Sequence, residues 1–160
     1  MVDVSLFRPR VQDGFEWILP DSDDSYEVLL SSGGRSLAGL SISCHLLRRD
    51  RGDRKVRLPA DLPWLGEHVL VLNSRALGVL EHLLAESGEL IPLEWADGEY
   101  WLFNCTTVAD PLDWEASDVA RLDSGQVLDI KRPEFRMDGL PRGPFRVAGF
   151  TREACSSLSR

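Results

Sequence analysis

A strand, a capped helix and a hairpin follow one another in the middle of this chain, and they constrain its fold more than any other part. Residues 69–72 are all apolar, which is typical of a short buried strand. Asn73 or Ser74 can accept the first free N–H groups of a helix through a side-chain oxygen. Leucines then recur three and four residues apart, which predicts an amphipathic helix over about 74–86 that ends near Gly88. These leucines are Leu77, Leu80, Leu83 and Leu84.

The clearest turn lies directly after this helix. Asp97-Gly98 separates two β-prone runs, residues 90–95 and 100–108, and this dipeptide favours the tight turn of a hairpin. The second run carries Tyr100, Trp101 and Phe103, and aromatic side chains pack well on a pleated sheet. We therefore expect a strong hairpin over about 90–108.

Shorter β-prone segments surround this centre, and turn residues separate them. An acidic loop over 21–25 and a turn over 31–34 are examples. Many strands in succession with at least one helix predict an α+β fold with a mainly antiparallel sheet. The length, 160 residues, is that of a single domain, 1–160. The predicted strands are residues 15–20, 26–30, 40–47, 116–122 and 126–130, with 145–148 as the last one.

The chain is strongly acidic, with a formal net charge of −8. Nucleic-acid-binding proteins usually carry a basic face, so we expect no nucleic acid as partner and a basic protein instead. One basic stretch, 48–57, is either a phosphate-binding patch or a solvated loop, and its two aspartates favour the loop. No stretch approaches the about 20 apolar residues that cross a membrane, and the amino terminus lacks a signal peptide. We therefore expect a cytoplasmic protein.

The residues that usually perform catalysis or bind metals are sparse. His45, His68 and His82 show no metal-ligand spacing, so we expect no metal and no cofactor. Cys44 and His45 are adjacent, and neighbours on a strand point to opposite faces, which prevents a Cys–His pair there. Three cysteines without a C-x-x-C motif do not form a disulfide framework. We expect buried or incidental thiols, with Cys105 packed inside the hairpin.

Carboxylates gather around a tryptophan after the hairpin, and three interpretations are open. They form a solvated rim, a metal-binding or acid–base cluster if they converge, or a patch that steers a basic partner. In the third interpretation a tryptophan beside them serves as an interface anchor. The partner-binding candidates are Asp110, Asp113, Trp114, Glu115 and Asp118.

The chain from Val69 onward resembles a bacterial immunity-protein family of polymorphic toxin systems, the myxobacterial-type family eleven, formerly a domain of unknown function. The resemblance implies a protein, encoded beside a toxin gene, that binds and neutralises the toxin. A nuclease is one candidate toxin, since an acidic surface can compete with nucleic acid for a basic cleft. The family has no established catalytic residues, so none are implied here. The similar segments are 69–74, 89–94, 99–106, 110–113 and 143–147 within a family-like core of 67–150, while 1–66 matches only loosely.

The carboxyl end departs from this family. Relatives continue after the strand over 145–147 with an apolar segment and a final helix, whereas residues 151–160 are polar here. One set of codons for residues 155–159, with an added C and read in the shifted frame, encodes Leu-Phe-Val-Ser-Glu, close to what relatives carry. We therefore expect a frayed tail that a frameshift has truncated.

Three classes of function remain at this point. The first is an immunity protein, not an enzyme, that binds its toxin stoichiometrically. The second is a small metal-assisted hydrolase, which requires Asp110, Asp113 and Asp118 to converge in a pocket. The third is a regulatory binding module outside toxin systems, since a fold does not fix a function. The resemblance and the acidic charge favour the first class, and the toxin and the oligomeric state stay open.

Overall fold

The computed structural model describes residues 4–31, 34–48, 56–66, 69–94, 99–150 and 154–159. Its helices are α1 (Asp23–Ser31), α2 (Ser74–Leu84) and a short 3₁₀ helix, η1 (Met137–Gly139). The strands are β1 (Val4–Phe7), β2 (Trp17–Pro20), β3 (Cys44–Leu47), β4 (Trp64–Gly66), β5 (Val69–Asn73), β6 (Gly88–Pro92), β7 (Tyr100–Cys105), β8 (Val108–Ala109), β9 (Asp118–Arg121), β10 (Val127–Arg132), β11 (Pro144–Val147) and β12 (Ala154–Ser159). No helix in these ranges has the length and apolar character needed to cross a membrane.

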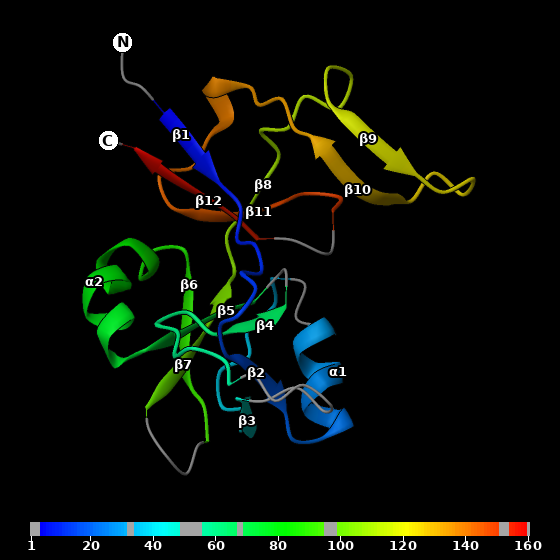
Figure 1. Ribbon diagram of the computed structural model, residues 1–160. Coiled ribbons are helices and arrows are strands. Elements are labelled where there is room, and N and C mark those ends of the chain that lie inside the picture. The colour runs from blue at the N-terminus through cyan, green and yellow to red at the C-terminus, as the bar shows by residue number, and fades with distance from the viewer. Residues whose placement is uncertain are drawn as a thin grey trace.

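The larger sheet has six strands in the order β3-β2-β4-β5-β7-β6, and only its β2–β4 pairing is parallel. This sheet curls until its two edge strands approach each other. A bridge joins Ser43 to Glu94, and the Glu94 N–H donates to the Ile42 carbonyl at 3.1 Å. In Figure 1, α1 and α2 flank this sheet on opposite sides. The predicted α+β fold with a mainly antiparallel sheet is confirmed.

The predicted helix and hairpin are confirmed, with small shifts of their bounds. The Asn73 side chain caps α2 by accepting the Ala76 N–H at 2.9 Å, and the helix ends at Leu84. Ala76 and Leu84 pack against Leu72 and the aromatic ring of Phe103. Strands β6 and β7 form the hairpin, and the predicted turn at 96–99 lies mostly outside the described residues. Gly88 does not end the helix as expected, because Ala85 follows the last helical residue and Gly88 begins β6.

The predicted strand over 26–30 is wrong, because this segment lies in α1. Local capping explains the difference. The Ser22 hydroxyl accepts the Ser25 N–H at 3.1 Å. Asp23 and Asp24 lie in the first turn, where their negative charges interact favourably with the positive end of the helix dipole. Val28 and Leu29 pack against the core of the large sheet, so the helix turns an apolar face inward. The predicted strand over 40–47 is shorter than expected, since β3 begins at Cys44.

The second sheet joins the two ends of the chain, in the order β1-β12-β11-β8. Strand 145–148 was predicted to be the last, which is wrong, because β12 follows it and pairs with both β1 and β11. The tail that was predicted to be frayed therefore supplies a central strand, and the frameshift stays a prediction. Figure 1 shows the first and last strands, β1 and β12, together in the upper part of the molecule. The core beneath this sheet consists of Leu112, Ile130, Phe145, Val147 and Phe150.

One carboxylate fastens the segment after α1 to the large sheet. Glu89 accepts hydrogen bonds from the Ser36 hydroxyl, from the Leu37 N–H at 2.9 Å and from the Asn104 amide at 3.2 Å. These bonds, the Ser36 bond first, hold the pKa of the Glu89 carboxyl below its usual value. Leu37 is buried in the core of this sheet, so the contacts of Glu89 also position an apolar anchor.

We expect the free energy of unfolding to fall in acid partly because of Glu89. A lowered folded-state pKa contributes stability that is fully present above the unfolded pKa of about 4.3 and is lost as the pH falls through the folded pKa. Glu89→Gln should lower the free energy of unfolding at pH 7 by about 1–2 kcal/mol. Urea titrations at pH 7, 5, 4 and 3 should show a shallower acid slope for the variant. An identical slope in both proteins would contradict this role.

Candidate functional site

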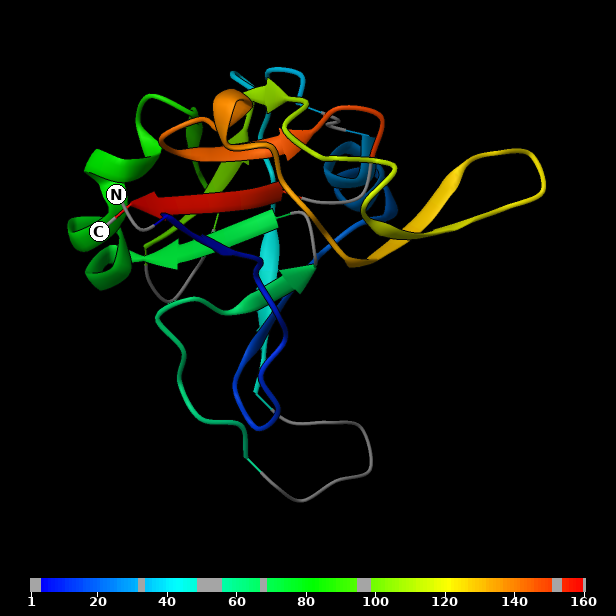
Figure 2. The same ribbon diagram turned by 90° about the horizontal axis from the view of Figure 1, so that it is seen from above.

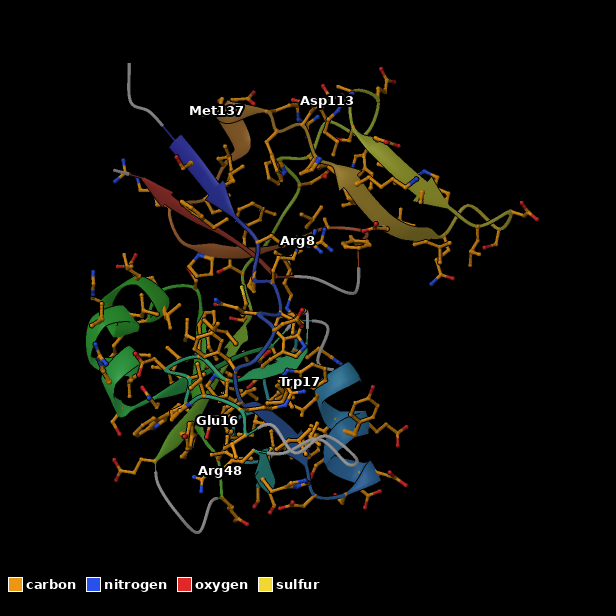
Figure 3. The ribbon with its side chains drawn as sticks, viewed as in Figure 1. Arg8, Glu16, Trp17, Arg48, Asp113 and Met137 are labelled. Atoms are coloured by element: carbon orange, nitrogen blue, oxygen red, sulfur yellow. The ribbon has the colours of Figure 1, made fainter. Side chains whose placement is uncertain are left out.

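The predicted partner-binding residues occupy a turn that leads into a projecting ribbon, and three of them have structural roles. Asp113 accepts the N–H groups of Glu115 and Ala116, at 3.1 and 3.0 Å, and so closes the turn after Leu112. This is an Asx-type turn, in which an aspartate replaces a missing backbone acceptor. Figure 3 shows Asp113 at the top of the molecule. Asp113 is half-buried and is therefore a poor candidate for a direct contact with a partner.

Trp114 is held in place from two sides. Its indole N–H donates to the Asp110 carboxylate at 3.1 Å, and the Arg121 guanidinium lies 5.3 Å from the ring centroid. The ring is half-buried against the core of the second sheet. Trp114 therefore stabilises the base of the ribbon, and the Asp110 carboxylate already accepts a hydrogen bond from it.

Other exposed carboxylates lie on the same unit, which we call the acidic ribbon, residues 110–132. Strands β9 and β10 pair antiparallel, and Figure 2 shows them extending away from both sheets. Glu115, Asp118 and Asp123 are all exposed there. Leu122 and Leu128 are exposed as well, so the ribbon combines negative charge with apolar surface. Of the five predicted residues, Glu115 and Asp118 are the ones whose side chains are exposed and take no part in the hydrogen bonds described for the turn.

The carboxylates do not form a common metal site in the described part of the chain. No three side chains of His, Cys, Asp or Glu lie close enough there to share an ion, so Asp110, Asp113 and Asp118 do not converge as the hydrolase interpretation requires. Asp21 and His45 do meet, at 2.6 Å, but the Ser43 hydroxyl also donates to Asp21. The three groups therefore lack the order of a serine–histidine–aspartate relay. His82 is exposed, and His68 lies outside the described residues.

Cys44 and Cys105 are both buried, as expected. Cys44 is buried while its neighbour His45 is exposed, which confirms the prediction of opposite faces. Burial, with a smaller contribution from Asp21, raises the pKa of the Cys44 thiol to about 12. Burial also raises the pKa of Cys105. Thiols with raised pKa values are weak nucleophiles at neutral pH, so neither has the character of a catalytic cysteine.

A cleft that the sequence did not reveal lies at one end of the large sheet. Strands β2, β4 and β7 begin there and β5 ends there, so four strand ends surround a space of about 520 Å³. Three half-buried aromatic side chains line it, namely Phe15, Trp64 and Tyr100. Arg10 and Arg75 also line the cleft, and both are exposed.

A buried carboxylate lies against this cleft. Glu16 is only 5% exposed, and its oxygens accept the Arg48 Nε–H and the Ala60 N–H, each at 3.3 Å. Figure 3 shows Glu16 and Arg48 close to each other in the lower half of the molecule. Ala60 and Tyr100 line the cleft, and the charge of Glu16 is near enough to reinforce the effect of burial in raising the pKa of the Tyr100 hydroxyl. A buried negative charge beside aromatic walls can bind a cation.

The sequence contains a long run without positive charge, which a search for individual motifs does not detect. Residues 76–120 contain ten carboxylates and no lysine or arginine. Counting cations in a sliding window reveals this run, which includes the turn of the acidic ribbon. By contrast, no local pattern marks Glu16, because its burial depends on segments far away in the sequence. Arg57 is described and stacks on Trp17 at 4.8 Å, while residues 49–55 of the basic stretch lie outside the described residues.

Comparison with known proteins does not assign the chain to a family. No protein-family model matches it. No curated protein matches it either.

Proposed function

We propose that this protein is a stoichiometric binding protein of the immunity type, which neutralises a basic toxin domain by occupying it. The observation that carries the proposal is the run of 45 residues, 76–120, with ten carboxylates and no lysine or arginine. Such a run creates a negative field that attracts a basic surface and raises the rate of encounter. The resemblance of residues 69–147 to the immunity family supports the same function.

The acidic ribbon is the surface that we assign to the first encounter. It projects from the body (Figure 2), and its carboxylates at Glu115, Asp118 and Asp123 are exposed. Exposed charges contribute little to the strength of a contact and act mainly on the association rate. Leu122 and Leu128 provide apolar area on the same ribbon, and such area is needed for a lasting contact.

The test uses the toxin domain that the proposal expects the adjacent gene to encode. We expect a one-to-one complex that suppresses the toxicity of that domain in co-expressing cells. A toxin that remains fully active with an excess of this protein, and no complex by size-exclusion chromatography, would refute the proposal.

Neutralising the ribbon should slow association by about tenfold or more at low salt. The variant is Glu115→Gln, Asp118→Asn and Asp123→Asn, which avoids the structural aspartates of the turn. The matched control is Glu81→Gln, Glu86→Gln and Glu94→Gln, three exposed carboxylates outside the ribbon with the same change of net charge. Stopped-flow measurements over a salt series should show slower association and a weaker salt dependence for the ribbon variant than for the control variant. Equal rates for the two triple variants would contradict a role for the ribbon.

A further inference from the structure

We propose that the cleft beside Glu16 receives the guanidinium of an arginine side chain from the basic partner, with the Glu16 carboxylate as its counter-ion. The identity of the partner rests on the proposed function, whereas the chemistry of the cleft rests on the cleft alone. The cleft of about 520 Å³ has room for a whole side chain of this size.

Glu16 has unused capacity to accept hydrogen bonds. A carboxylate offers about four acceptor positions, and bonds from charged donors are typically about 2.7–2.9 Å long. The two contacts of Glu16 in the described structure are both 3.3 Å long, and one of them comes from a neutral backbone N–H. A guanidinium can add two parallel, shorter bonds to such a carboxylate.

Arg48, which forms an ion pair with Glu16, neutralises the Glu16 charge only in part. Arg48 is 57% exposed, whereas the Glu16 side chain is 6% exposed, so most of the arginine lies in water while the carboxylate lies out of it. A close counter-ion stabilises a desolvated charge more strongly than it stabilises a charge in water. An arginine of the partner that approaches Glu16 from the cleft side is therefore stabilised by the Glu16 carboxylate. Arg48 then either shares this carboxylate or moves into solvent.

The walls of the cleft favour arginine over other cations. Phe15, Trp64 and Tyr100 present aromatic rings, and a planar guanidinium stacks on such rings better than a compact ammonium does. Arginine stacks on tryptophan elsewhere in the described part of the chain, with Arg57 on Trp17 and Arg121 on Trp114. A metal ion is a poorer occupant, because no three ligating side chains of the described segments come together.

The arginines of the lining do not cancel this preference. Arg75 is 84% exposed and lies 3.6 Å from Asp61, which also lines the cleft and offsets its charge. Arg10 is exposed, so water and salt screen it. Glu16 alone among these charges is buried, and it therefore dominates the interior of the cleft.

The cleft and the acidic ribbon can be tested separately. In Figure 3, Glu16 lies well below Asp113, which marks the base of the ribbon. The probe for the cleft is Nα-acetyl-arginine amide, which carries the guanidinium without a charged backbone. Nα-acetyl-citrulline amide is the matched probe, since it has nearly the same shape and no charge.

We expect the arginine probe to shift the backbone NMR signals of Glu16, Ala60 and Tyr100 in a saturable way, with a dissociation constant on the order of millimolar. The citrulline probe should bind at least tenfold more weakly. Glu16→Gln should weaken binding of the arginine probe at least tenfold, and the surface variant Glu115→Gln should change it less than twofold. The two-probe comparison on the unmodified protein needs no variant, so it holds even if Glu16→Gln does not fold.

Three outcomes would overturn the proposal: no saturable shifts, equal binding of both probes, or shifts centred on the ribbon. These outcomes are independent of the proposed function. Binding of the probe in the cleft, together with a toxin that forms no complex, would keep the cleft and refute the immunity function. A toxin complex that forms normally while the probe does not bind would support the immunity function and refute the role of the cleft.

Discussion

Gly88→Ala should destabilise this protein by about 3 kcal/mol or more, although it adds only one methyl group. A Cβ at position 88 would lie 2.2 Å from the backbone oxygen of Asn104 and 2.8 Å from the Phe103 ring. Neither neighbour can yield easily. Asn104 is buried and its amide donates to the Arg35 carbonyl at 2.7 Å, and Phe103 is buried beneath α2. The hairpin of β6 and β7 must therefore separate or shift.

Urea unfolding followed by tryptophan fluorescence measures this loss, and thermal unfolding should show a midpoint lower by roughly 10 °C. The matched control is Gly78→Ala, in the middle of α2, where an added Cβ meets nothing within 4 Å. There the same substitution should be neutral or stabilising by about 0.5–1 kcal/mol, because alanine favours a helix. If both variants behaved alike, the close approach of β6 and β7 at Gly88 would be wrong.

Phe145→Ala should cost about 3–5 kcal/mol and lower the stability of the whole chain in one transition. The Phe145 side chain is fully buried, in the core of the second sheet, and meets Phe135 edge to face at 6.3 Å between ring centroids. The two sheets are tied together next to this residue. Arg146 donates through Nε to the Cys105 carbonyl at 2.8 Å and through its backbone N–H to the Thr107 carbonyl at 2.9 Å.

A cooperative loss has a clear signature in denaturation curves. Far-UV circular dichroism and tryptophan fluorescence should give the same, lowered midpoint for Phe145→Ala. Phe7→Ala is the control, because that side chain is 50% exposed and should contribute less than about 1 kcal/mol. Two separate transitions in the Phe145 variant would show that the sheets unfold independently.

The candidate site was only partly predictable from the sequence. The partner-binding candidates are close together on one turn, as their spacing indicates, yet Asp113 closes that turn and Asp110 binds Trp114. The spacing of carboxylates in the sequence shows which of them are neighbours. It does not show which of them form hydrogen bonds within the folded chain. The accessible members are therefore Glu115 and Asp118, with Asp123 added by the ribbon.

By itself, the sequence determined the elements that local physics controls. The cap at Asn73, the leucine stripe of α2 and the alternation of Cys44 and His45 depend on residues a few positions apart, so periodicity and hydrogen-bonding capacity predict them. The hairpin of β6 and β7 belongs to the same group.

Only the tertiary structure decided the features that depend on distant segments. The parallel pairings of β2 with β4 and of β8 with β11 join segments that no local turn connects, and β12 finds its place only between β1 and β11. Glu16 is the clearest case. Its hydrogen-bond donors are 32 and 44 residues away in the chain, so its burial follows from the packing of strands and leaves no pattern in the residues around it.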